Sequence, residues 1–125
     1  MSPLSTAFQP PAAVVSVTLQ NPSEPRLKLQ LEGVLDTGSD VTAVPVPIVR
    51  RLKLRKRTRI PVGGLDGYQL ERDSYLVNLE FGNKRMERRV VITWLGDFLV
   101  LGRDVLNEFT LLIDGKMRQF ELRDP

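Results

Sequence analysis

The sequence has 125 residues, 42% of them hydrophobic, and a net charge of +3, which together fit one small domain with its own core. It contains no cysteine and no histidine, so disulfides, thiolate and imidazole metal sites, and Ser-His or Cys-His catalysis are excluded. Any acid–base chemistry must therefore use carboxylates, Lys, Tyr or water, and we expect no metal or organic cofactor.

The first twelve residues predict a flexible or extended leader, because Pro3, Pro10 and Pro11 stand among small polar residues. A single domain over residues 13–125 is expected to follow. The N-terminus has no basic region followed by a long apolar stretch, and no run has the length of a membrane span. We therefore expect a cytoplasmic protein with no membrane partner.

Alternating and β-branched segments predict mostly short strands in the rest of the chain. Asp114-Gly115 is a strong tight-turn signal near the end. The predicted elements are strands at 14–19, 26–36 and 41–46, a glycine-rich hairpin at 60–69, a hairpin formed by 74–81 and 85–93, a strand at 98–102, a helix within 103–109 and a hairpin at 110–122. This pattern indicates an all-β domain, closed or sandwich-like, with one short helix.

A basic segment, RRLKLRKRTR at residues 50–59, holds seven cations and no acid. Subtracting these seven from the net charge of +3 leaves −4 for the rest of the chain. A solvated loop and strand face is the plain interpretation. An acidic substrate or nucleic acid is the alternative, because phosphate contacts need such clusters. The lack of interleaved aromatics argues against nucleic acid as a partner.

The segment VLDTGSD (34–40) runs an apolar strand directly into Asp36, and Gly38 allows the backbone to turn sharply behind it. A turn aspartate that caps local amides is the plain interpretation. Two adjacent carboxylates, however, share a proton and can act as base and acid on a water molecule and an amide carbonyl. The chain has no second Asp-Thr/Ser-Gly, since Asp66-Gly67 and Asp114-Gly115 lack the hydroxyl residue. The second carboxylate would have to come from another molecule.

The motifs resemble those of the retropepsins, the retroviral-type aspartic proteases, which are two-fold symmetric dimers with one Asp-Thr/Ser-Gly loop per chain. LDTGSD (35–40) is similar to the catalytic loop, and VGGLDG (62–67) to the glycine-rich flap. FLVLGRDVL (98–106) is similar to the strand and helix around Gly-Arg-Asp/Asn, and LLIDGKMRQFEL (111–122) follows where the terminal strands belong. The resemblance covers roughly residues 14–122 and implies a small closed barrel with one short C-terminal helix and a flap hairpin.

The resemblance also implies roles for individual residues. Asp36 would be the catalytic aspartate, Thr37 would hydrogen-bond across to the partner loop, and Gly38 would allow close approach of substrate. Arg103 would form a planar, two-pronged pair with Asp40.

Two further groups complete the implied site. The Ser39 hydroxyl would donate to the Asp36 carboxylate, favour its ionised form and lower the working pH, and Asp104 would join the supporting set. The implied flap and substrate-binding residues are Gly63, Gly64, Leu65, Asp66 and Gly67, for which an ordinary hairpin loop is the alternative.

The function implied is that of an aspartic endopeptidase that cleaves protein or peptide substrates as a homodimer, with no metal. Two alternatives remain open from the sequence. One is a non-catalytic dimeric module of the same fold that binds peptides. The other is a nucleic-acid-binding β-barrel that uses residues 50–59, whose binding would be salt-sensitive and would survive the loss of Asp36.

Overall fold

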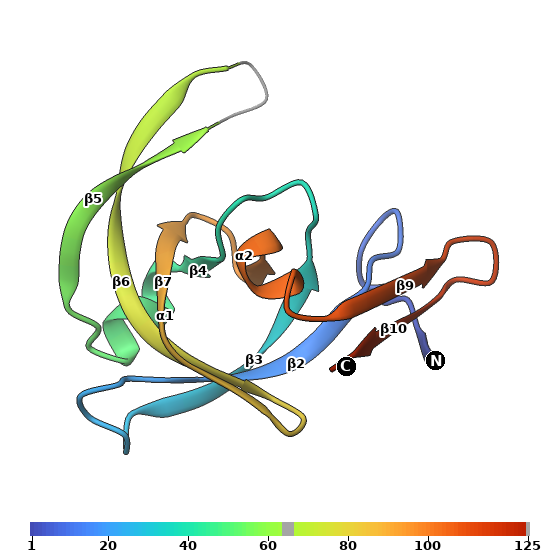
Figure 1. The fold of residues 1–125 in the computed structure, drawn as a ribbon, viewed down its shortest axis with the longest axis horizontal. Helices are drawn as coiled ribbons and strands as arrows, with labels where there is room; N and C mark the ends of the chain where they lie inside the picture. Colours follow the sequence, from blue (N-terminus) through green and yellow to red (C-terminus); the bar gives the residue numbers. More distant parts are fainter. Residues whose placement is uncertain (64–66, 125) are drawn as a thin grey trace.

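The computed structural model describes residues 1–63 and 67–124 (Figure 1). In this part of the chain strands predominate, with two short helices. The strands are β1 (Ser2–Pro3), β2 (Val14–Gln20), β3 (Lys28–Leu35), β4 (Ala43–Pro45), β5 (Lys56–Gly63), β6 (Gln69–Phe81), β7 (Lys84–Trp94), β8 (Leu99–Leu101), β9 (Thr110–Asp114) and β10 (Gln119–Arg123). The helices are α1 (Val46–Arg51) and α2 (Arg103–Leu106).

The main sheet closes on itself as a barrel, which confirms the predicted all-β class. Its strands follow the order β2-β3-β8-β4-β7-β6, and a second pairing between β2 and β6 completes the ring. The alternating apolar side chains of these strands point inward, and Val17, Leu79, Leu99 and Leu101 are fully buried there. Strand β5 pairs only with the first half of β6, so this hairpin extends beyond the ring (Figure 1).

Strand β8 lies between β3 and β4 in the barrel. It pairs in parallel with β3, from Gly33–Leu99 to Leu35–Leu101, and antiparallel with β4 at Val100–Ala43. The connection from β3 to β4 must therefore pass around the end of β8. This connection is the loop that contains the Asp-Thr-Gly sequence, so the topology places that loop beside the start of α2.

The helices differ from the sequence prediction in two respects. The sequence predicts a strand at 41–46 ended by Pro45 and Pro47, but helix α1 begins at Val46 directly after β4. The fixed φ of a proline suits the first turn of a helix as well as it suits the end of a strand, and here Pro47 stands in that first turn. The predicted single helix within 103–109 is α2, which has only four residues and continues as turns.

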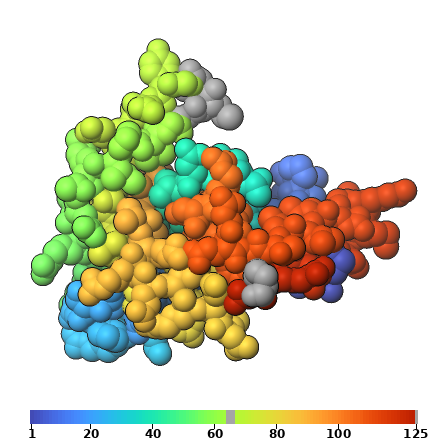
Figure 2. Space-filling view, viewed as in Figure 1, coloured from blue at the N-terminus to red at the C-terminus, as the bar shows by residue number. Residues whose placement is uncertain are grey.

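The two ends of the chain form a second, three-stranded sheet in the order β1-β10-β9. The leader is attached to this sheet, because Ser2 and Pro3 pair with Phe120 and Gln119, and it then folds back into a loop closed by a bridge between Ser5 and Ala12. In the β9–β10 turn Arg118 adopts the left-handed conformation, with φ 55°. Figure 2 shows this hairpin extending to one side of the barrel, away from β5 and β6.

Candidate active site

The loop after β3 is attached to the β8–α2 junction by its backbone. The Asp36 amide donates to the Leu101 carbonyl at 2.9 Å, and the Arg103 amide donates to the Ser39 carbonyl at 2.8 Å. A further bond within the loop joins the Ser39 amide to the Asp36 carbonyl at 3.2 Å. These bonds fix the direction in which the Asp36 side chain leaves the barrel.

Asp36 itself lies at the surface of the chain, with Thr37 and Gly38 beside it, and all three are exposed. The Gly38 amide donates to Asp36 Oδ1 at 2.9 Å, which holds the carboxylate over its own loop. A Cβ at Gly38 would lie 3.2 Å from the same oxygen, so a larger residue would crowd the carboxylate. The structure thus brings the three predicted catalytic residues together as one exposed turn.

Arg103 reaches from the first residue of α2 to both sides of this loop. Its guanidinium pairs with the Asp40 carboxylate, and it also donates to the Thr37 carbonyl at 2.6 Å. The predicted pairing partner is therefore the observed one, but the predicted two-pronged geometry is wrong, because one guanidinium nitrogen contacts Asp40 and another donates to the Thr37 carbonyl. One rigid guanidinium thus ties the loop to the helix both before and after Ser39.

Asp104 supports the loop through a residue that the sequence analysis missed, Thr42. The Thr42 hydroxyl donates to Asp104 Oδ1 at 2.8 Å, and the Thr42 amide donates to Oδ2 at 3.1 Å. The same hydroxyl accepts from the Gly102 amide at 3.2 Å, and Thr42 is fully buried. The only signal in the sequence is a hydroxyl residue two positions after Asp40.

Gly102 is the second missed residue. A Cβ placed there would lie 2.7 Å from the carbonyl carbon of Val41 and 2.9 Å from the Ser39 carbonyl oxygen. Such distances are shorter than van der Waals contact with backbone that cannot move aside. Only glycine lets the β8–α2 junction approach the loop this closely.

The expected role of Ser39 is wrong in this structure. Its hydroxyl donates its one hydrogen to the Val41 carbonyl at 2.8 Å and not to Asp36. The backbone acceptor lies two residues away in the same turn, within reach of a short side chain, which is a common arrangement for serine. The Ser39 hydroxyl therefore holds its own turn and does not act on the Asp36 carboxylate in this structure.

The β5–β6 hairpin rises from the barrel on the same side as the loop that contains Asp36 (Figure 1). Gly63 is the last residue of β5, and Gly67 adopts φ 82°, a left-handed conformation that suits glycine. The other predicted flap residues, Gly64, Leu65 and Asp66, lie outside the described residues.

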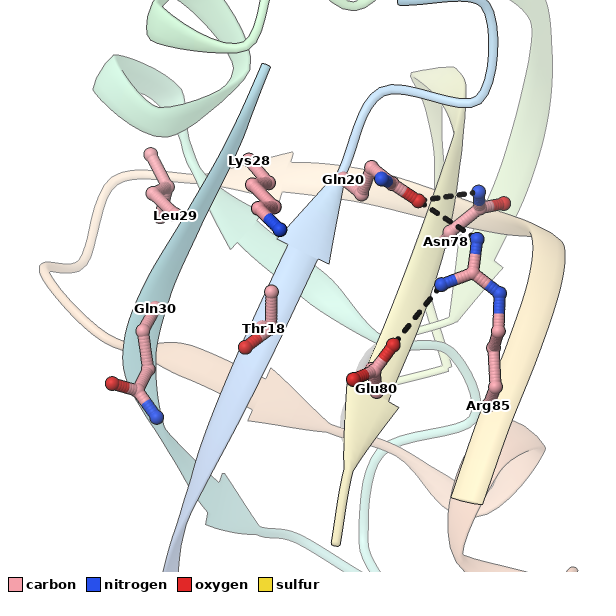
Figure 3. Close-up of a pocket in the computed structure, with 8 residues that line it drawn as sticks. All are labelled: Thr18, Gln20, Lys28, Leu29, Gln30, Asn78, Glu80 and Arg85. Atoms are coloured by element: carbon pink, nitrogen blue, oxygen red, sulfur yellow. Dashed lines mark hydrogen bonds and ion pairs between the residues drawn. The ribbon is translucent and has the colours of Figure 1, made fainter. Parts of the chain in front are cut away.

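A pocket of about 410 Å³ lies at the far end of β3 from Asp36, where β2 meets β6 (Figure 3). Its polar side chains satisfy one another: Gln20 accepts from Asn78 at 3.1 Å and from Arg85 at 2.8 Å. Hydrogen bonds from Arg85 to Glu87 and Glu80 raise the pKa of the Arg85 guanidinium. We assign this network a structural role at the closure of the barrel.

Neither a metal cluster nor a membrane helix is found in residues 1–63 and 67–124. No group of three or more acidic, histidine or cysteine side chains in this part of the chain is placed to hold a metal ion. Neither of its helices is long and apolar enough to cross a bilayer.

A closed barrel that presents an Asp-Thr-Gly loop against the start of a Gly-Arg-Asp helix defines a class, and the chain has the fold of the retropepsin-like aspartic proteases. No family model and no curated protein sequence matches the chain.

Two solved structures show the fold. The EIAV protease in complex with the inhibitor HBY-793 is 23% identical with a TM-score of 0.59, over 77% of this chain and 86% of that one. A retropepsin-like aspartic protease from Rickettsia conorii is 16% identical with a TM-score of 0.54, over 86% of this chain and 80% of that one.

Proposed function

We propose that the protein is an aspartic endopeptidase that works as a homodimer, with Asp36 of each copy in one shared site. The observation that carries this proposal is the contrast within one loop: its backbone is fixed to β8 and α2, while the Asp36 carboxylate is exposed. A turn aspartate with a purely local role would need neither the Arg103 pairing nor the close approach of Gly102.

The reaction would use a water molecule held between the two carboxylates, which share one proton. The ionised Asp36 takes a proton from the water as its oxygen attacks the carbonyl carbon, and the protonated Asp36 donates to the carbonyl oxygen. Collapse of the tetrahedral intermediate breaks the C–N bond: the departing amine takes the proton that one Asp36 had gained from the water, and the other Asp36 takes back a proton from a hydroxyl of the intermediate as the new carboxyl group forms. Thr37 of each loop would bond with the partner loop and keep the carboxylates coplanar.

Two features support a dimer. The chain contains one Asp-Thr-Gly, and residues 36–38 are exposed in a single copy, so a second copy would both complete the dyad and cover it. The β9–β10 hairpin also carries exposed apolar side chains, Leu112, Ile113 and Met117. These side chains offer apolar contact area outside the barrel for a partner chain.

The substrate would be an extended peptide segment of a protein. The β5–β6 hairpin rises on the same side as the loop between β3 and β4, so it would close over such a segment and pair with its backbone as a further strand (Figure 1). Backbone pairing of this kind tolerates many sequences, and side-chain pockets would then select residues around the cleaved bond.

The test is the cleavage of a mixed peptide library between about pH 3 and 7, the range in which a carboxylate pair titrates. Wild type is compared with Asp36→Asn and with Asp97→Asn, an exposed acid outside the loop. Light scattering measures the oligomeric state of each variant. We expect wild type and Asp97→Asn to cleave as dimers, and Asp36→Asn to lose cleavage by a factor of about 10² or more while remaining dimeric.

Other outcomes would reject the proposal. Cleavage that survives in Asp36→Asn would mean that another group activates the water. A folded wild-type dimer that cleaves nothing across the pH range would instead favour the non-catalytic peptide-binding module.

A further inference from the structure

A second polar region lies on another flank of the barrel, around a hollow of about 400 Å³ that we call the basic hollow. Its lining comes from the turn after β2, the segment from α1 into β5, and one residue each of β6 and β7. The lining residues are Asn21, Pro22, Ser23, Glu24, Lys53, Leu54, Arg55, Arg57, Leu76 and Arg88. Figure 2 shows the residues near position 25 beside the start of β5 at this flank.

The four cations of the basic hollow have no ion pair within the described residues. Elsewhere in the basic segment Lys56 and Arg59 both pair with Asp73 on β6. The one acid that lines the hollow, Glu24, pairs with Arg26 outside it. Four uncompensated positive charges therefore converge on one concave surface, which concentrates their field on whatever enters it.

Two of these cations sit in a backbone conformation that disfavours them. Lys53 and Arg88 both have φ 51°, in the left-handed region where a side chain is strained and glycine is not. A position that served only to turn the chain would be more stable with glycine. Arg118 in the β9–β10 turn shares this conformation, so the conformation alone does not identify a function. What distinguishes Lys53 and Arg88 is that both line the same hollow, which indicates that their charges are used together.

Two buried asparagines hold these strained residues in place. Asn21, 5% exposed, donates from Nδ2 to the Leu52 carbonyl at 2.8 Å and the Lys53 carbonyl at 3.3 Å. Asn78, 7% exposed, accepts from the Arg88 amide at 3.0 Å through Oδ1. Interior side chains thus fix the backbone of both cations, so the basic hollow is preformed.

We propose that the basic hollow binds the phosphate backbone of nucleic acid without reading its sequence. Guanidinium groups match phosphate oxygens in a planar, two-pronged geometry, and three of the four cations are arginines. No aromatic residue lines the hollow, so it has no surface on which bases would stack. The contacts available are therefore to phosphates.

An acidic peptide is the competing ligand. The exposed lining is both polar and apolar, so the preference for nucleic acid rests on the three guanidinium groups and their two-pronged fit to phosphate oxygens. The test below therefore includes a polyglutamate peptide. The proposal revises the sequence-based expectation against nucleic acid, which treated the segment as a solvated face. It is independent of the Asp36 chemistry, because none of the lining residues belongs to that loop.

The test is fluorescence anisotropy with a labelled DNA duplex and a labelled RNA hairpin of arbitrary sequence, between about 50 and 200 mM salt. The key variant is Arg88→Gly, and its matched control is Arg118→Gly. Arg118 is also exposed and has φ 55°, so both variants make the same chemical change in the same backbone conformation. The melting temperature of each variant is measured alongside.

We expect Arg88→Gly to melt no lower than wild type, to bind several-fold more weakly and to lower the slope of log affinity against log salt by about 1. Arg118→Gly should bind as wild type does. The double variant Arg55→Gln/Arg57→Gln should lower the slope by about 2, and Asp36→Asn should bind fully.

Three results would overturn the proposal. The first is an equal loss of binding in Arg88→Gly and Arg118→Gly, which would indicate diffuse charge attraction. The second is wild-type binding that is absent or insensitive to salt. The third is tighter, Arg88-dependent binding of a polyglutamate peptide, which would assign the hollow to an acidic protein segment.

Discussion

The Asp36 loop and the basic hollow use their polar groups in opposite ways. Around the loop the supporting carboxylates have partners inside the chain, Arg103 for Asp40 and Thr42 for Asp104. The exposed carboxylate of Asp36 accepts a hydrogen bond from Gly38 and from no other residue that the structure describes. In the hollow the framework is partnered through Asn21 and Asn78, and the cations are left to solvent. In both regions the polar side chains that have partners hold the backbone in place. The charged side chains without such partners in the described part of the chain, Asp36 in the loop and the cations in the hollow, indicate what each region would bind or react with.

Of the substitutions we propose, Gly102→Ala should disturb the packing of the Asp36 loop against the β8–α2 junction most strongly. The added Cβ would lie 2.7 Å from the Val41 backbone, so the β8–α2 junction must separate from the loop. We expect a loss of about 3 kcal/mol or more in the free energy of unfolding, measured by urea titration. Gly115→Ala is the control, since nothing lies within 4 Å of its Cβ. Equal stabilities of the two variants would contradict the packing argument.

Thr42→Val tests the polar support of the same loop without changing its shape. It removes the hydroxyl that donates to the half-buried Asp104 and accepts from Gly102, and it leaves the buried Gly102 amide without that partner. We expect a loss of about 2 kcal/mol. Thr110→Val, on the exposed face of β9, should cost almost nothing in the same urea titration. A small effect at Thr42 would mean that water replaces the hydroxyl.

Asn21→Ala removes a buried polar side chain that supports the basic hollow, as Thr42→Val does for the Asp36 loop. Asn21 also accepts from the Ser23 amide at 2.8 Å and the Glu24 amide at 3.0 Å, so its loss releases the turn as well as the end of α1. We expect a loss of about 2 kcal/mol by urea titration. Peptide cleavage per folded molecule should not change. A loss of cleavage would show that the two regions are coupled.

Ser39→Ala is the mildest of these changes. Because its hydroxyl bonds to the Val41 carbonyl, we expect a loss of about 1 kcal/mol in stability and no change in the pH profile of peptide cleavage. A shift of that profile toward higher pH would instead place the hydroxyl on the Asp36 carboxylate in the assembled dimer.

The sequence predicted the barrel and the Asp36 loop because both are encoded by short, contiguous patterns. Alternation of apolar residues gives the strands, and LDTGSD with LGRD supplies both halves of the loop and its support. The same motifs predicted the pairing of Arg103 with Asp40. Helix α1 could not be predicted in this way, because the fixed φ of Pro47 is compatible both with the end of a strand and with the first turn of a helix.

The rest of the site depends on contacts between distant segments. Thr42 has a partner 62 residues away, and nothing in its own surroundings distinguishes it from a strand residue. The basic hollow needs Arg88, which only the fold brings beside residues 53–57. The run of cations was visible in the sequence, but which of them lack acidic partners was not.

The pairing of β1 with β10 places the two ends of the chain side by side in one small sheet. If the two ends were joined, the chain would form a ring, and the strand pairing of the barrel would not require the termini to be at their present position. Joining the ends through a short linker and opening the exposed β6–β7 turn at Gly82–Asn83 would keep every strand pair in place. Such a permuted chain would free the termini from the sheet that carries the β9–β10 hairpin, and tags or fusion partners could then be attached away from it.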